Sequence, residues 1–244
     1  MRIDVLGVGF DNLTPEEAAA AGAALAGADG FHYAVTPNPE FLLAAKRNAP
    51  FRQALLNADL VLADGIGVVY SAKILGRPLK GKVTGIGFAQ LLMAWMAEHG
   101  KRLFLLGAKP GVAEQAAANL RQIYPGLTIC GTHDGYFRED TPVVEAIRSA
   151  GADVVFVCLG APKQELWMVE HGPATGAHLM VGLGGSLDVF AGVVERAPEG
   201  FQKLGLEWLY RLIKEPRRIG RMARLPLVLV EAAGQRLTGK GRRA

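Results

Sequence analysis

Asp64 is the strongest candidate in the sequence for a general base. It stands in 63-ADGIG-67, directly after the apolar run 59-DLVLA-63, which predicts a short buried strand. A carboxylate at a strand end, partly shielded from water, can take a proton from a reacting hydroxyl. The same position would also suit the N-cap of a helix over residues 66–75. Spacing alone leaves both interpretations open.

A second polar cluster, 36-TPNPE-40, follows the apolar run 31-FHYAVT-36. Thr36 offers a hydroxyl and Asn38 an amide, and the two prolines restrict the backbone between them. A stiff loop loses little conformational entropy when it binds a ligand. Both side chains could instead cap their own turn, as Asx and hydroxyl side chains commonly do.

Glycine-rich loops follow three further apolar runs, at residues 107–111, 160–165 and 182–188. Glycine allows backbone N–H groups to approach an anion such as a phosphate, and a following helix N-terminus favours negative charge there. Residues 182–187, G-L-G-G-S-L, lack the last glycine of the dinucleotide fingerprint, as do residues 7–12, G-V-G-F-D-N. The loops therefore indicate either a phosphate site of another kind or simple tight turns.

These clusters lie in a chain that alternates short apolar runs with helical patterns. The expected strands are 2–8, 31–36, 59–63, 102–107, 127–131, 153–160 and 178–184. Helix start signals such as Thr14-Pro15 and Thr141-Pro142 fall between them. This rhythm predicts an α/β fold with a Rossmann-like, largely parallel sheet. Because ligands bind beyond the carboxyl ends of parallel strands, the clusters should meet at one edge.

We expect an α/β body over residues 1–198, with lobes at about 1–85 and 86–195, and a basic helical appendage over 199–244. Residues 201–244 contain eleven Lys/Arg and three Asp/Glu, a local charge of +8, although the whole chain carries only +4. The appendage should form helices at about 199–214 and 216–237. Such asymmetry indicates an anionic partner: a membrane surface, a nucleic acid or a phosphorylated substrate.

Composition excludes several classes of protein. Half of the residues are hydrophobic and 20% are charged, as in a globular enzyme rather than a disordered chain. The N-terminus does not read as a signal peptide, and no apolar run approaches the ~18 residues of a spanning helix, so we expect a cytoplasmic protein. Cys130 and Cys158 are expected to be buried, reduced thiols, and no metal-ligand spacing is present.

Taken in order, eight segments resemble the WecG/TagA/CpsF family of bacterial glycosyltransferases. Each segment alone is a weak match, but the ordered set is specific and covers most of the chain. The segments are 10-FDNLT-14, 36-TPNPEF-41, 63-ADGIGVV-69, 83-VTG-85, 160-GAPKQE-165, 182-GLGGSLDVFAG-192, 195-ERAP-198 and 206-LEWLYRLIKEPRRIGR-221.

The resemblance implies an inverting transfer of a sugar, N-acetylmannosamine in the best-known members, from a UDP-sugar to an undecaprenyl-diphosphate-linked GlcNAc. Such enzymes work at the inner face of the cell membrane, in the synthesis of teichoic acid, common antigen or exopolysaccharide. No cofactor is implied beyond the UDP-sugar substrate, and we expect no obligatory metal because the chain lacks an Asp-x-Asp pair.

The resemblance also implies roles for individual residues. Asp64 would be the base, with Thr36 and Asn38 beside it in the sugar pocket. The donor would be bound by Lys82, Gly107, Gly160, Pro162, Gln164, Glu165, Gly182, Gly184, Gly185 and Asp188. The diphosphate of the acceptor, or the membrane, would meet Arg196, Arg211, Arg217, Arg218, Arg221 and Arg224.

The sequence departs from the family pattern at two positions. Many relatives have Arg before Val-Thr-Gly and an acidic residue shortly after it, whereas this chain has Lys82 and Gly87. Lysine keeps the positive charge but lacks the two-pronged guanidinium that matches a diphosphate.

Two alternatives belong to other classes of protein. A nucleotide-dependent oxidoreductase shares the α/β rhythm but should carry a complete dinucleotide fingerprint. A nucleic-acid-binding protein would explain the basic appendage, but no such module is recognised, so no nucleic acid is expected. The appendage should instead dock on an anionic membrane, or simply pack on the body with a solvated basic face. Its arginines could reach the diphosphate within one chain or across a homo-oligomer.

Overall fold

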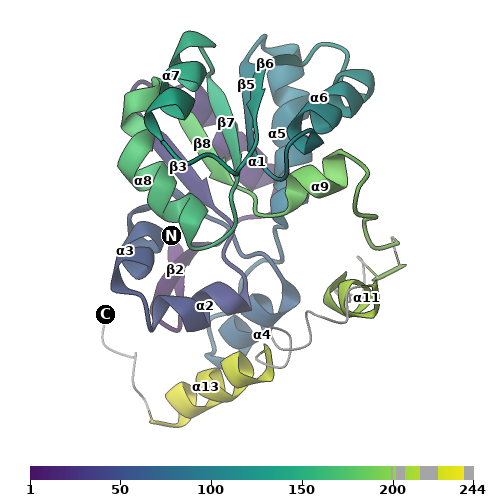
Figure 1. Ribbon diagram of the computed structural model, residues 1–244. Coiled ribbons are helices and arrows are strands. Elements are labelled where there is room, and N and C mark those ends of the chain that lie inside the picture. The colour runs from purple at the N-terminus through teal and green to yellow at the C-terminus, as the bar shows by residue number, and fades with distance from the viewer. Residues whose placement is uncertain (199, 202–206, 215–224, 239–244) are drawn as a thin grey trace.

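The computed structural model describes residues 1–198, 200, 201, 207–214 and 225–238. Within these residues six parallel strands form a central sheet in the order β4-β3-β8-β7-β5-β6 (Figure 1). The strands of this sheet are β3 (His32–Val35), β4 (Leu60–Val61), β5 (Arg102–Gly107), β6 (Thr128–His133), β7 (Val154–Cys158) and β8 (Leu179–Gly182). The α/β class and the parallel sheet expected from the sequence are confirmed.

The central strands are buried on both faces, which explains their nearly continuous apolar sequence. Successive residues of a strand face opposite sides, so Phe104 and Leu106 join one core while Leu103 and Leu105 join the other. These two cores are the apolar layers between the sheet and its helices.

Helices cover both faces of the sheet (Figure 1). The first core is covered by α3 (Ala49–Asn57), α7 (Thr141–Ser149) and α8 (Lys163–Thr175). The second is covered by α1 (Pro15–Gly27), α5 (Gly85–Glu98), α6 (Val112–Ile123) and α9 (Ser186–Phe190). The helix start expected at Thr14 is confirmed, since Thr14 and Glu17 form a reciprocal capping box.

The single strand expected over residues 2–8 is instead part of a hairpin that extends to Asp11. The hairpin consists of β1 (Arg2–Val5) and β2 (Val8–Asp11), which pair antiparallel around Leu6 and Gly7. Both turn residues have positive φ, 56° and 87°, the conformation of a tight two-residue hairpin turn. The sequence pattern indicated little of this turn, because leucine rarely adopts a positive φ.

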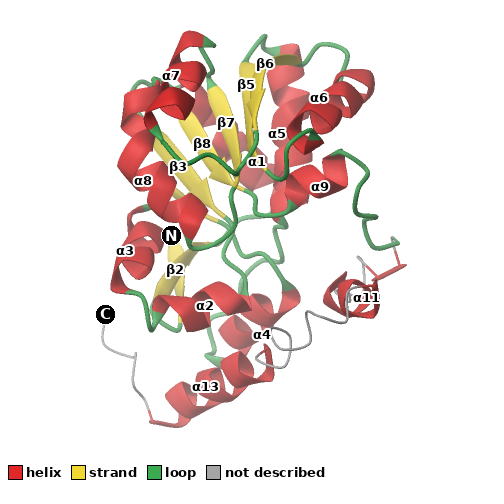
Figure 2. Cartoon of the chain, viewed as in Figure 1, coloured by secondary structure: helices red, strands yellow, loops and turns green. Residues whose placement is uncertain are grey.

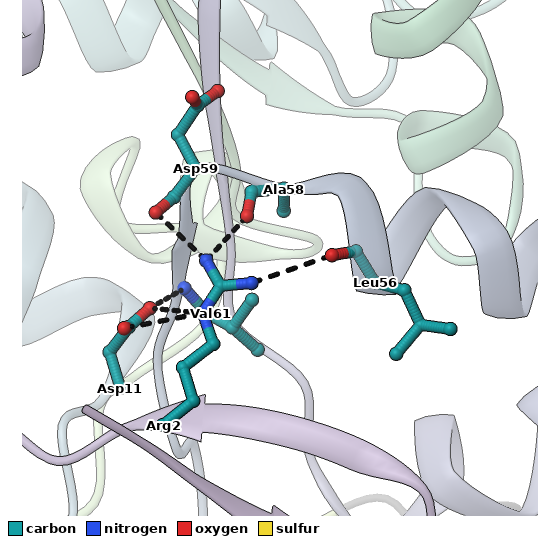
Figure 3. Close-up of polar contacts among 6 residues, drawn as sticks. All are labelled: Arg2, Asp11, Leu56, Ala58, Asp59 and Val61. Atoms are coloured by element: carbon teal, nitrogen blue, oxygen red, sulfur yellow. Dashed lines mark hydrogen bonds and ion pairs between the residues drawn. The ribbon is translucent and has the colours of Figure 1, made fainter.

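The hairpin is fastened to the edge strand of the sheet by Arg2 and Asp11 (Figure 3). The Arg2 guanidinium donates to the carbonyl oxygens of Ala58 and Asp59, and its Nε donates to Asp11. Asp11 in turn accepts a hydrogen bond from the backbone N–H of Val61 in β4, at 2.9 Å. These contacts occupy backbone groups that an edge strand would otherwise leave open to another chain.

Strands from both expected lobes share the one sheet. β3 and β4 come from residues 1–85 and β5 to β8 from residues 86–195, and the direct pairing of β3 with β8 joins them. The division of the chain into lobes and appendage stays a prediction.

The described part of the appendage contains α11 (Glu207–Lys214) and α13 (Leu225–Thr238). α13 packs against α4 (Ile66–Ile74) and α2 (Pro39–Ala45), with Val228 and Ala232 buried (Figure 1). Lys46 pairs with Glu231, and Arg236 donates to the carbonyl of Leu75. No helix in the described ranges is both long and apolar enough to cross a bilayer.

Candidate active site

The loops that follow the parallel strands gather at one end of the sheet, toward α2 and α4 (Figure 2). Asp64 lies there, half-buried, three residues after β4. Its N–H donates to the carbonyl of Pro37 at 3.1 Å, which ties it to the proline-rich loop. Its Oδ2 accepts from the N–H of Gly85, the first residue of α5, at 3.4 Å.

Asp64 does not cap the helix that follows it. The N-cap of α4 is Gly65, at φ 100°, and it makes no side-chain cap. The capping alternative raised from spacing is therefore wrong for this position. The carboxylate instead faces the N-terminus of α5, where unpaired N–H groups and the helix dipole favour an anion.

The proline-rich loop uses its two polar side chains differently. Asn38 is the N-cap of α2, and its Oδ1 accepts from the N–H groups of Glu40 and Phe41 at 2.8 and 3.3 Å. The capping interpretation is thus confirmed for Asn38. Thr36 is only 6% exposed, and its hydroxyl donates to the carbonyl of Gly182 at 2.9 Å. Thr36 therefore fastens the end of β3 to the end of β8.

Gly85, the first residue of α5, allows this helix to lie close to the ends of β3 and β8. A Cβ at Gly85 would lie 3.2 Å from Thr36 Oγ1 and 3.3 Å from Leu183 Cδ2, so any larger residue would require these side chains to shift. Thr36, Asp64 and Gly182 are in this way brought together around one helix N-terminus. Gly85 was not among the predicted site residues, although it closes the segment 83-VTG-85 that carried part of the resemblance.

Gln164 and Glu165 point into the protein rather than into solvent. Gln164 is 1% exposed and Glu165 is 0% exposed. Gln164 Oε1 accepts from the N–H groups of Gly160 at 3.2 Å and Gly184 at 3.0 Å, and its Nε2 donates to Glu165 Oε1 at 2.7 Å. Burial raises the pKa of the Glu165 carboxyl to about 7.

The other glycines predicted at the donor site do different things. Gly107, at φ 129°, is required by packing, because a Cβ there would lie 2.3 Å from the carbonyl oxygen of Cys158. Gly160 and Gly184 also have positive φ, 77° and 55°, but a Cβ at either would meet nothing within 4 Å. A Cβ at Gly185 would lie 3.7 Å from the carboxylate of Asp188 on α9. Pro162, after a cis peptide bond, is the N-cap residue of α8.

Lys82 and Arg196 both pair with one carboxylate of the appendage, that of Glu207. Lys82 Nζ lies 3.0 Å from Glu207 Oε2, and Arg196 Nε lies 3.8 Å from Glu207 Oε1. Arg196 also donates from Nη1 to Gln90 Oε1 on α5, at 3.0 Å. Sequence reasoning missed Glu207, whose only signal was its place in the segment 206–221. Arg211 lies on α11, whereas Arg217, Arg218, Arg221 and Arg224 lie outside the described residues.

The arrangement offers a carboxylate, a helix N-terminus and two cations around the carboxyl edge of a parallel sheet. A carboxylate at such an edge can act as a base, and the cations can bind an anionic leaving group. In the described part of the chain, no three His, Cys, Asp or Glu side chains are grouped as metal ligands.

Comparisons with known proteins show the family to which the chain is similar. The model of the glycosyl transferase WecG/TagA/CpsF family matches residues 3–242. A protein of Bacillus spizizenii is 38% identical over 194 residues, which are 80% of this chain and 76% of that protein. A protein of Staphylococcus aureus strain MW2 is 34% identical over 234 residues, 95% of this chain and 92% of that protein. Both are named N-acetylglucosaminyldiphosphoundecaprenol N-acetyl-beta-D-mannosaminyltransferase. These matches do not favour the oxidoreductase alternative.

Proposed function

Because the chain belongs to the glycosyl transferase WecG/TagA/CpsF family, we propose that it transfers N-acetylmannosamine from a UDP-sugar to N-acetylglucosaminyl-diphospho-undecaprenol. The observation that carries the proposal is the position of Asp64 at the carboxyl edge of the sheet, against the N-terminus of α5. The names of the two relatives supply the substrate and the sugar.

Asp64 acts as the general base in a single displacement. Its carboxylate takes the proton from the acceptor hydroxyl of the GlcNAc unit as that oxygen attacks the anomeric carbon of the donor. The bond between this carbon and the UDP oxygen breaks, and UDP leaves with the electron pair. One displacement inverts the anomeric configuration.

The diphosphate that leaves is stabilised by positive charge from the protein rather than by an obligatory metal. Lys82 and Arg196 both pair with Glu207 and supply positive charge at the site. N–H groups of the glycine loops and the appendage arginines complete the anion site. The appendage arginines act within one chain or across a homo-oligomer.

The lipid-linked acceptor requires the enzyme to work at a membrane. The basic appendage docks peripherally on the anionic inner face of the cell membrane, which brings the carboxyl edge of the sheet to the diphosphate of the acceptor. A cluster of Lys and Arg near such a surface contributes roughly 1 kcal/mol per residue.

A transfer assay tests the proposal directly. The full-length protein is incubated with a panel of UDP-sugars and a lipid-diphosphate-GlcNAc analogue, and the products are separated by mass and anomeric configuration. We expect transfer of N-acetylmannosamine with inversion, and UDP as the second product. Transfer of a different sugar would revise the donor, whereas no transfer from any UDP-sugar would refute the proposal.

A further inference from the structure

Glu165 is an ionisable side chain in a place that normally excludes one. It lies in the first turn of α8 with 0% exposure, and its Oε2 has no hydrogen-bond partner among the described residues. Burial of a carboxyl group with an unsatisfied oxygen destabilises the folded protein. An apolar side chain of similar size would serve packing better. A role beyond packing is therefore needed to explain Glu165.

The contact that Glu165 makes is one of three that together fix the orientation of the Gln164 amide. Gln164 Oε1 faces two backbone donors, the N–H groups of Gly160 and Gly184, and Nε2 faces the Glu165 carboxyl. The reversed amide would set its NH2 group against two donors and its oxygen against a carboxyl oxygen. Only the observed orientation satisfies all three partners.

The amide thereby joins two loops that are distant in sequence. Gly160 belongs to the loop after β7, and Gly184 to the loop after β8. Gly182 makes the approach possible, because a Cβ there would lie 2.9 Å from Gln164 Nε2 and 3.3 Å from Glu165 Oε1. The carbonyl of Gly182 also accepts a hydrogen bond from the hydroxyl of Thr36, and the next residue, Pro37, accepts the N–H of Asp64 through its carbonyl.

We propose that Glu165 is a positioning residue, whose carboxyl holds the Gln164 amide so that the loops after β7 and β8 form one rigid surface for the donor nucleotide. This inference rests on the proposed function for the identity of the ligand. Glu165 and Gln164 act from behind the loops, since both side chains are buried, and neither needs to contact the donor.

The test compares four variants of the full-length protein. Glu165→Gln keeps an acceptor for Gln164, Glu165→Met removes it at similar volume, and Gln164→Ala removes the amide. Glu170→Met is the matched control, because Glu170 lies on the same helix with its side chain 75% exposed. Hydrogen exchange of the segments that contain Gly160 and Gly184 is measured without ligand, the UDP dissociation constant by calorimetry, and Tm by thermal unfolding.

We expect Glu165→Met and Gln164→Ala to exchange about fivefold to tenfold faster at both segments, and to bind UDP more weakly by a similar factor, as for the loss of one hydrogen bond. Glu165→Gln and Glu170→Met should match the wild type in exchange and in UDP affinity, and Glu165→Met should not unfold at a lower temperature. Unchanged exchange in Glu165→Met would overturn the inference, as would Glu165→Gln behaving like Glu165→Met. A wild type that does not bind UDP would refute the proposed function, while the exchange data would still decide the role of Glu165.

Discussion

Lys82 Nζ and Glu207 Oε2 lie 3.0 Å apart, in a pair that joins the body to the appendage across 125 positions of sequence. Both side chains are 19% exposed, so the pair is partly shielded from water and salt. Tyr210, one turn further along α11, donates to Glu195 at 3.3 Å and strengthens the same junction. A cation that the proposed mechanism needs for the diphosphate is thus already bound to a carboxylate.

Glu207→Gln should strengthen UDP binding, because the diphosphate would no longer have to displace a carboxylate from Lys82 and Arg196. Loss of one partly shielded ion pair predicts a dissociation constant about threefold to tenfold lower. Calorimetry with UDP measures this, and Glu231→Gln on α13, whose partner is Lys46, should leave the constant unchanged. Weaker binding by Glu207→Gln would show that Glu207 supports the site instead of competing for it.

Asp64→Asn should keep UDP affinity and Tm but lose turnover by about 10²–10⁴-fold, the usual contribution of a general base. The amide can still accept the hydrogen bond from Gly85, so the local structure should persist. Steady-state transfer rates with saturating donor measure the loss. Turnover within a few-fold of wild type would place the base elsewhere.

The strand-end rule predicted where the polar residues of the candidate site lie. Apolar runs located the parallel strands, and the polar residues after them, Thr36, Asp64 and Gln164, do meet at one edge of the sheet. The rule works because parallel strands share one direction, so their carboxyl ends coincide. The hairpin at Leu6 and Gly7 was missed because its turn lacks the usual Asn-Gly or Asp-Gly signal.

The direction in which each side chain points could not be predicted, because it depends on partners far away in sequence. Thr36 is bound to Gly182 across 146 positions, and nothing near Thr36 indicates that its hydroxyl is already used. Gln164 belongs to a segment of the family resemblance, yet it turns inward to Gly160 and Gly184. Spacing predicted that these residues gather at one edge of the sheet, but not which partners their side chains bind.

Metal removal should leave transfer intact. The proposed stabilisation of UDP depends on lysine, arginine and N–H donors, none of which a chelator removes. The assay is run with EDTA and then with added manganese or magnesium. Activity that disappears in EDTA and returns with manganese would contradict this prediction.

The stability of the protein should depend on pH through Glu165. Its pKa is raised from 4.5 to about 7 in the folded protein, so the folded state holds this proton more tightly than the unfolded state. The stability that this proton contributes is fully present below pH 4.5 and is lost as pH rises to about 7. A shift of this size corresponds to about 3 kcal/mol.

Glu165→Gln removes this titration. The difference in free energy of unfolding between Glu165→Gln and the wild type should therefore grow in favour of the variant from pH 4.5 to pH 7.5. Urea unfolding at a series of pH values measures it. A difference that stays constant with pH would mean that Glu165 is not buried as the structure has it.

Docking on anionic membrane should depend on the basic residues of the appendage. Because α13 packs against α2 and α4, the test should change these residues without deleting the appendage. Deleting the appendage would expose the surfaces of α2 and α4 that now cover Val228 and Ala232, so a truncated chain could bind vesicles through new apolar surface. Replacing Arg217, Arg218, Arg221 and Arg224 with Gln removes charge without removing α13. At roughly 1 kcal/mol each, the four changes should weaken binding to anionic vesicles by up to about a thousandfold at low salt.

Co-sedimentation with phosphatidylserine vesicles measures the effect, and high salt should release the wild type. A control with half the charge change replaces Arg121 and Arg148 on α6 and α7, which lie at the opposite end of the molecule from α13 (Figure 1). That control should sediment almost as well as the wild type, because its charges would face away from the membrane. If the four-arginine variant still sedimented like the wild type, the appendage would not be the membrane anchor, and its basic face would simply be solvated.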